Sequence, residues 1–68
     1  MGNFYTIFKE LRQEKEISQA KLAKILNISQ SAIAKWELGK TEPTLSNIIS
    51  ICTCFDVSAD YLLGLSDD

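Results

Sequence analysis

The stretch SQAKLAKILNISQSAIAKWELGK, residues 18–40, contains two short helical patterns that only a few residues separate. Ser18 is a suitable N-cap for the first helix, predicted over 19–26, because its hydroxyl can accept a free backbone N–H of the first turn. Asn27 tolerates the left-handed conformation and ends that helix. The apolar residues of this first pattern recur at helical spacing: Leu22, Ala23, Ile25 and Leu26.

The second helix of the stretch is predicted over 30–38, between the N-cap Ser29 and the terminating Gly39. With about 100° between successive residues, the helix has an inward face and an opposite, outward face. The inward face predicts core packing. Trp36 is therefore expected to pack against a later helix or Pro43 rather than to stack on a base. The inward residues are Ala32, Ile33, Trp36 and Glu37, and the outward residues are Ser31, Ala34, Lys35 and Leu38, with Gln30 at the edge.

The rest of the chain predicts three more helices and no second domain, so residues 1–68 form one all-α, compact bundle of five short helices. N-caps are expected at Asn3, Thr44 and Ser58. The three further helices are predicted over 4–16, 45–55 and 59–63.

The net charge of −2 argues at first against a nucleic-acid partner, because phosphate binding depends on positive charge. The total conceals a split along the chain. Residues 1–40 hold all seven basic residues and four acidic ones, whereas residues 41–68 hold five acidic residues and no basic one. Such asymmetry predicts a protein with an oriented electrostatic face.

Several function classes find no support in the sequence. There is no His, no Gly-rich phosphate loop and no metal-spaced cluster, so we expect no enzyme, metal, cofactor or small-molecule ligand. Cys52 and Cys54 stand about 200° apart on a helix and are expected to be small buried residues. No apolar run reaches membrane-spanning length and no signal peptide is evident, which predicts a cytoplasmic protein. Gly2 and Thr6 fit the loose myristoylation pattern, but a capping role for Asn3 explains this start better.

The outward face of helix 30–38 has two interpretations. Gln, Ser and Lys are ordinary surface residues, so a merely solvated face is one. The other is a DNA-reading face, since the major groove admits a helix and these side chains match base edges. Gln can bond adenine, Lys can reach the acceptors of guanine, and Ala can touch a thymine methyl.

The neighbouring residues favour the second interpretation. Residues 18–40 with their Trp36-Glu37-Leu38-Gly39 segment, the later Pro43 and the ending VSADYLLG together resemble the lambda-repressor, Cro and Xre-like helix-turn-helix family. The resemblance extends over about residues 7–64. It implies a lambda-repressor-like domain that binds double-stranded DNA in a sequence-specific way and regulates transcription, most simply as a repressor.

The resemblance also implies roles for individual residues. Arg12 and Glu37 match a buried ion pair, although a solvent-exposed Glu with a loose partner is the alternative. Phosphate contacts fall on Gln19, where free helical N–H groups attract anions, on Ser29, and on the amide and side chain of Lys40. The base-reading positions are Gln30, Ser31 and Lys35, with Ala34 giving clearance in the groove.

One reading helix per chain implies a homodimer, at least on DNA, bound to a (pseudo)palindromic operator with half-sites about 34 Å apart. The expected location is then the cytoplasm, at the nucleoid. Glu42 and Thr44 stand where relatives carry basic residues, which predicts few phosphate contacts and modest non-specific affinity.

The competing function is a protein-interaction module with the same fold, such as an antitoxin-like or accessory regulator. The sequence leaves open whether it is complete or part of a longer regulator. The candidate subunit interface comprises Val57, Ala59, Tyr61 and Leu63.

Overall fold

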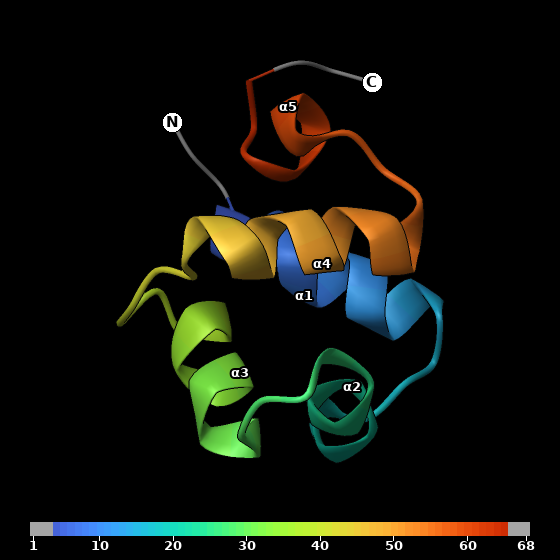
Figure 1. The fold of residues 1–68 in the computed structure, drawn as a ribbon, viewed down its shortest axis with the longest axis vertical. Helices are drawn as coiled ribbons and strands as arrows, with labels where there is room; N and C mark the ends of the chain where they lie inside the picture. Colours follow the sequence, from blue (N-terminus) through green and yellow to red (C-terminus); the bar gives the residue numbers. More distant parts are fainter. Residues whose placement is uncertain (1–3, 66–68) are drawn as a thin grey trace.

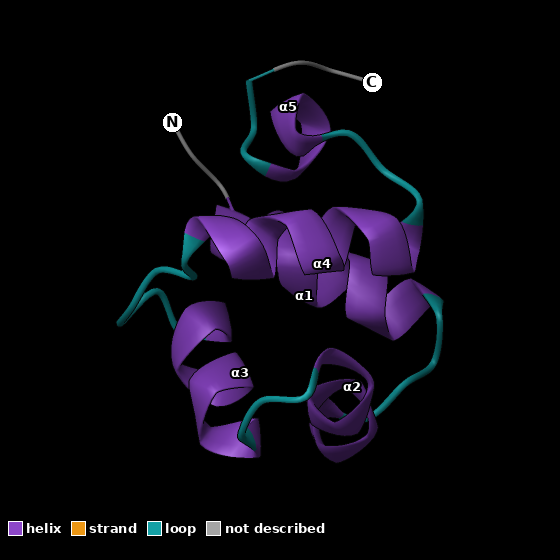
Figure 2. Cartoon of the chain, in the orientation of Figure 1, coloured by secondary structure: helices purple, strands orange, loops and turns teal. Residues whose placement is uncertain are grey.

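The computed structural model describes residues 4–65, and every regular element in that range is an α-helix. α2 and α3 lie at one end of the molecule, α5 lies at the other, and α1 and α4 cross the middle (Figures 1 and 2). The all-α, five-helix prediction is therefore confirmed, and no helix of the described range is long and apolar enough to cross a membrane. The helices are α1 (Phe4–Glu14), α2 (Gln19–Leu26), α3 (Gln30–Glu37), α4 (Leu45–Phe55) and α5 (Ala59–Leu62).

Four of the five helices begin at the N-caps that the sequence predicts. The side-chain oxygens of Ser18, Ser29, Thr44 and Ser58 each accept the backbone N–H three residues further on, at 3.0 to 3.2 Å. Each cap satisfies one of the first-turn N–H groups that have no partner inside the helix. The predicted fifth cap, Asn3, lies outside the described residues.

The helix ends depart from prediction mainly in α1. α1 stops at Glu14 rather than at residue 16, because Glu16 adopts a left-handed φ of 56° and turns the chain. Asn27 ends α2 as predicted, with a φ of 59°. The last residues of the predicted helices 30–38 and 59–63 act instead as C-caps, so α3 and α5 are each one residue shorter.

The core joins α1 to the inward face of α3. Phe8, Leu22, Ile33, Ile51 and Leu62 are fully buried, one from each helix. The Trp36 ring is buried as predicted, and its aromatic partners belong to α1. It meets Phe4 and Phe8 of α1 edge-on, with ring centroids 6.4 and 5.7 Å apart, in the geometry that aromatic pairs favour.

Cys52 and Cys54 of α4 are free thiols and are half-buried rather than fully buried. Desolvation raises the pKa of both thiols, and for Cys54 it outweighs the nearby positive charge of Lys15. A raised pKa keeps a thiol protonated and unreactive, in agreement with a packing role.

Candidate nucleic-acid interface

The two faces of α3 differ as the helical period predicts. Ile33, Trp36 and Glu37 are buried in the domain. The opposite side carries the four residues expected to read bases: Gln30, Ser31 and Lys35 are exposed and Ala34 is half-buried. This outward face of α3, defined by these four residues, contains only one charged side chain. Its small residues allow the helix backbone to come close to the base edges in a DNA groove.

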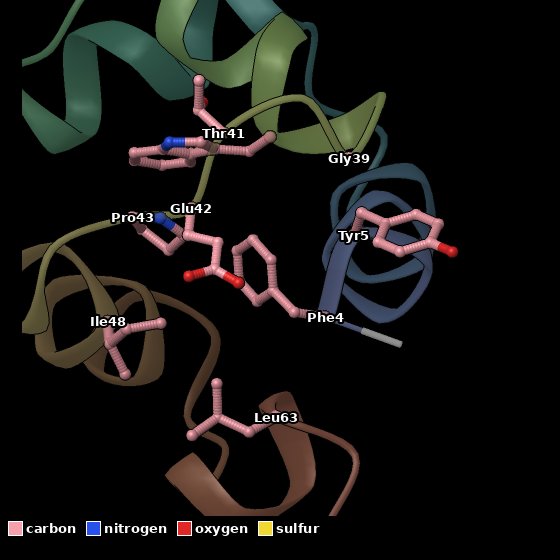
Figure 3. Close-up of a pocket in the computed structure, with 9 residues that line it drawn as sticks. Phe4, Tyr5, Gly39, Thr41, Glu42, Pro43, Ile48 and Leu63 are labelled. Carbon is pink, nitrogen blue, oxygen red and sulfur yellow. The ribbon is translucent and has the colours of Figure 1, made fainter. Parts of the chain in front are cut away.

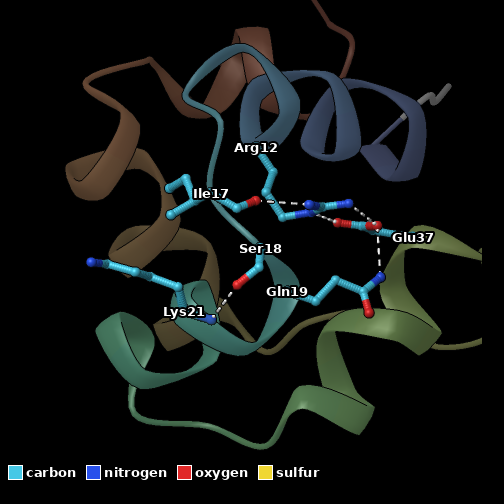
Figure 4. Close-up of polar contacts among 6 residues, drawn as sticks. All are labelled: Arg12, Ile17, Ser18, Gln19, Lys21 and Glu37. Carbon is cyan, nitrogen blue, oxygen red and sulfur yellow. Dashed lines mark hydrogen bonds and ion pairs between the residues drawn. The ribbon is translucent and has the colours of Figure 1, made fainter.

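Glu37 is held at the centre of a polar network that connects three helices (Figure 4). Nε of Arg12 donates to Oε2 of Glu37 at 2.6 Å, and Nη2 of Arg12 donates to Oε1 of Glu37 at 3.1 Å. Only 4% of the Glu37 side chain is exposed, so the ion pair is shielded from water. Two parallel bonds to one carboxylate make a strong and orientationally specific contact. Arg12 and Glu37 thus occupy the arrangement that the family resemblance implies.

Two further bonds extend this network beyond the pair that the sequence predicts. Nη1 of Arg12 donates to the carbonyl of Ile17 at 2.8 Å, which ties the end of α1 to the turn before the Ser18 cap. Nε2 of Gln19 donates to Oε1 of Glu37 at 3.0 Å. The bond from Gln19 joins residues 18 positions apart that the packing of α2 against α3 brings together, whereas the bond from Arg12 spans five residues around the turn after α1.

Gln19 retains hydrogen-bonding capacity for a ligand. Glu37 is an acceptor, so the amide of Gln19 must point its NH₂ toward Glu37, which leaves a second Nε2 hydrogen for another partner. The Ser18 hydroxyl accepts the N–H of Lys21, the third residue of α2. The N–H groups of the first two residues have no partner within the helix, because a helix has no carbonyl groups before its first turn. These donors converge at the positive end of α2, where an anion is favoured.

The structure changes one of the expected phosphate contacts. The backbone N–H of Lys40 donates to the carbonyl of Lys35 at 2.9 Å and the N–H of Gly39 donates to that of Trp36, so the amide of Lys40 is already used. This is the Schellman pattern that follows a helix ending in a left-handed Gly, here with a φ of 73°. Of the two expected contacts of Lys40, the exposed side chain therefore remains available for phosphate. Ser29 caps α3 with its oxygen and keeps its hydroxyl hydrogen.

The pKa of Glu37 reflects opposing effects. Burial raises it, but the hydrogen bonds from Arg12 and Gln19 and the charges of Arg12 and Lys9 together outweigh burial and lower the pKa below 4.5. A carboxylate with a lowered folded pKa contributes stability that is fully present above its unfolded pKa and is lost as pH falls through the folded pKa.

We therefore expect a specific pH dependence of stability. Urea unfolding of the wild type should be compared with that of Arg12→Met/Glu37→Met, which lacks the pair. The difference in unfolding free energy between the two proteins should stay constant from pH 7 to 5 and change steadily in favour of the variant below about 4.5, because only the wild type must protonate Glu37. Parallel curves down to pH 3 would contradict the role given to Glu37.

The candidate subunit interface is partly used inside the domain. Val57, Tyr61 and Leu63 are half-buried and pack against the core, and Ala59 is exposed. Leu38, at the end of α3, stays largely exposed as expected.

A hollow of about 480 Å³ lies between the start of α1, the connection after α3, and helices α4 and α5 (Figure 3). Phe4, Pro43, Ile48 and Leu63 form apolar walls, and the exposed Thr41 and Glu42 stand on its rim. No feature of the sequence predicts this hollow.

Comparison with known proteins agrees with this geometry. The chain is 32% identical over 60 residues to the HTH-type transcriptional regulator YobD of Bacillus subtilis (strain 168), an alignment with 88% of this chain and 54% of that protein. It is 40% identical over 56 residues to the HTH-type transcriptional activator BcrR of Enterococcus faecalis, with 82% of this chain and 28% of that protein. This chain thus spans about half the length of the first relative and less of the second. Their names describe regulators of transcription and not enzymes, in line with the expectation from the sequence.

The fold has a close match among solved structures. The crystal structure of the c2 repressor of Salmonella phage P22, in complex with synthetic operator 9T, superposes with a TM-score of 0.88 at 30% identity, covering 97% of this chain and all of that one. The family model described as "Helix-turn-helix" matches residues 8–62. Because that model spans most of the chain and the superposition extends over nearly all of it, the chain belongs to the helix-turn-helix family of lambda-repressor, Cro and Xre-like DNA-binding domains.

Proposed function

We propose that this protein binds double-stranded DNA in a sequence-specific way and regulates transcription, with α3 in the major groove. The observation that carries the proposal is the outward face of α3, Gln30, Ser31, Ala34 and Lys35, held beside the free N–H groups of α2 by the Arg12–Glu37–Gln19 network. The network fixes the two helices relative to each other, so that one can read bases while the other binds phosphate.

The contacts divide into two kinds. Gln30, Ser31 and Lys35 supply base-edge hydrogen bonds, and Ala34 gives clearance or touches a thymine methyl. Gln19, Ser29 and the side chain of Lys40 supply phosphate contacts that set the register of the protein on the duplex. The phosphate contacts are few, so we expect modest non-specific affinity and a shallow salt dependence.

Regulation follows most simply by occupancy of an operator. A single domain presents one reading helix, so two subunits are needed to read two half-sites one helical turn, about 34 Å, apart. Repression requires only that this complex exclude other proteins from the same DNA. The repressor bound to operator DNA that superposes on this chain supports this form of the proposal.

The proposal is tested by titrating the purified protein into a fluorescent random-sequence duplex. Binding should be measurable at about 50 mM salt, and the logarithm of the binding constant should fall linearly with the logarithm of the salt concentration. Selection of bound duplexes from a random pool should then return a symmetric motif with two half-sites. No binding at low salt would contradict the proposal, and an asymmetric single motif would contradict the two-subunit form.

The side chain of Lys40 offers a sharper prediction within this assay. Lys40→Gln should weaken binding to all duplexes alike and reduce the salt slope by about 1, because it removes one phosphate contact without touching a base. Lys15→Gln is the matched control, since it removes the same charge from a site near Cys54 of α4. Equal salt slopes for the two variants would show that Lys40 does not contact a phosphate.

A further inference from the structure

One face of α1 lies along the C-terminal half of α3. At the start of α1, the ring of Tyr5 lies 3.5 Å from the position that a Cβ atom on Gly39 would take. Two turns later, Arg12 pairs with Glu37. Tyr5, Lys9 and Arg12 follow one another at spacings of four and three residues, so they share one face of the helix. Lys9 therefore stands between the two points at which α1 meets α3.

Lys9 carries the charge on this face that has no partner inside the domain. Each guanidinium nitrogen of Arg12 donates a hydrogen bond within the domain, two of them to Glu37, so the charges of that pair offset each other. The side chain of Lys9 is exposed and forms no ion pair with any residue between positions 4 and 65. The three donors of its ammonium group are therefore available to a ligand.

The ammonium of Lys9 lies near the polar network without bonding to it. Burial raises the pKa of Glu37, and the charge of Lys9 is one of those that lower it, so the two groups are close. Both oxygens of Glu37 already accept hydrogen bonds from Arg12 or Gln19. The positive charge of Lys9 thus adds to the field on this side of α3 instead of being used by the carboxylate.

The anion site at the start of α2 lies on the same side of the network. Gln19 borders this site and bonds to Glu37 at 3.0 Å. The first turn of α2 contains one cation, Lys21, and its side chain points away from Gln19 and Glu37 (Figure 4). The first turn of α2 therefore brings no cation to its own anion site, whereas Lys9 of α1 lies on that side.

We propose that Lys9 and Tyr5 bind the DNA backbone, so that α1 is a third helix of the interface. The ammonium of Lys9 pairs with a phosphate beside the one held at the start of α2. The hydroxyl of Tyr5 donates to another phosphate oxygen. The ring of Tyr5 is 46% exposed and lies against Gly39, and its hydroxyl points away from the hollow (Figure 3). Because Lys40 follows Gly39, Tyr5 stands beside a second proposed phosphate contact.

This proposal rests on the proposed function and adds to its electrostatics. Among the phosphate contacts proposed above, only Lys40 carries a charge, so Lys9 brings the charged contacts of each domain from one to two. Each phosphate that a protein neutralises contributes about 0.9 to the slope of the logarithm of the binding constant against that of the salt concentration. The hydroxyl of Tyr5 is neutral and should strengthen binding without changing this slope.

The first test measures affinity for the selected duplex over a range of salt concentrations. Lys9→Gln should weaken binding about fivefold per domain and lower the salt slope by about 1 per domain. Tyr5→Phe should weaken binding about threefold and leave the slope unchanged. Lys15→Gln is the matched control for charge and should bind like the wild type. Both replaced side chains are exposed, so circular dichroism should show unchanged helix content.

A second test distinguishes a direct contact from a long-range effect of charge. Neutral methylphosphonate linkages are placed one at a time along a half-site of the selected duplex. At one position, the neutral linkage should weaken the wild type about fivefold and affect Lys9→Gln little, because both changes remove the same contact. That position should remain fully sensitive in Lys15→Gln.

The outcomes separate this proposal from the proposed function. A wild type that binds no duplex would refute the proposed function, and the contacts of α1 with it. A wild type that binds, with Lys9→Gln matching the affinity and slope of Lys15→Gln, would overturn the proposal alone. Losses that add at every neutral linkage would also overturn the contact of Lys9. Wild-type affinity in Tyr5→Phe would overturn the contact of Tyr5.

Discussion

Ala34→Glu should abolish sequence-specific DNA binding while the domain stays folded. Ala34 lies between the base-reading residues of α3 and is half-buried, with no hydrogen-bonding group of its own to lose. A carboxylate at this position would enter the groove between two rows of phosphates, where a like charge costs several kcal/mol. We expect affinity for the selected duplex to fall by at least about 100-fold, which corresponds to about 3 kcal/mol. Fluorescence anisotropy with that duplex measures the loss.

The control for this variant must carry the same added charge elsewhere. Thr6→Glu places it at an exposed position of α1, so it changes the net charge equally without altering α3. Its affinity should stay within a few-fold of the wild type, and both variants should melt close to the wild-type temperature. If Ala34→Glu binds the selected duplex as well as Thr6→Glu does, α3 does not enter the groove through this face.

Glu37→Gln should cause the largest loss of stability of any single polar substitution in the described chain. The variant leaves the guanidinium of Arg12, itself largely buried, without its anionic partner. Breaking a buried ion pair from one side costs about 3 to 5 kcal/mol. A domain of this size has a total stability of about 3 to 5 kcal/mol, so much of the variant should be unfolded at 25 °C. Thermal and urea unfolding followed by circular dichroism measure this directly.

Two comparisons isolate the ion pair from a general effect of losing a carboxylate. Glu10→Gln, at an exposed position of α1, should change stability by no more than about 0.5 kcal/mol. Arg12→Met/Glu37→Met removes both partners together and should recover much of the stability, since no uncompensated charge is left. A Glu37→Gln variant that melts with the Glu10→Gln control would show that the pair contributes little.

The local features of the fold were predictable because they depend on neighbours in the chain. A capping bond spans three residues, so Ser18, Ser29, Thr44 and Ser58 could be assigned without any tertiary information. The early end of α1 could not, because its polar residues continue the helical pattern up to Glu16 and only the backbone reveals the turn.

The candidate site divides in the same way. The helical period alone separates the buried Ile33 and Trp36 from the outward Gln30 and Ser31. The lost amide of Lys40 could also have been foreseen, since Gly39 predicts the Schellman pattern that uses it. The bond from Gln19 to Glu37 could not, because it joins residues 18 positions apart through the packing of α2 against α3.

The sequence by itself therefore determined the number of helices, most of their ends and the outward face of α3, because capping and periodicity act over one or two turns. Only the tertiary structure decided which side of α4 faces the core. Ile48, Ile51 and Phe55 are buried while Leu45 and Ile49 are exposed, yet all five are apolar. The polar side chains of α4 are the uncharged Ser46, Asn47, Ser50 and Thr53, so no charged stripe marks which of the many apolar residues stay outside, and the packing of the neighbouring helices decides it. That choice leaves Leu45 and Ile49 at the surface.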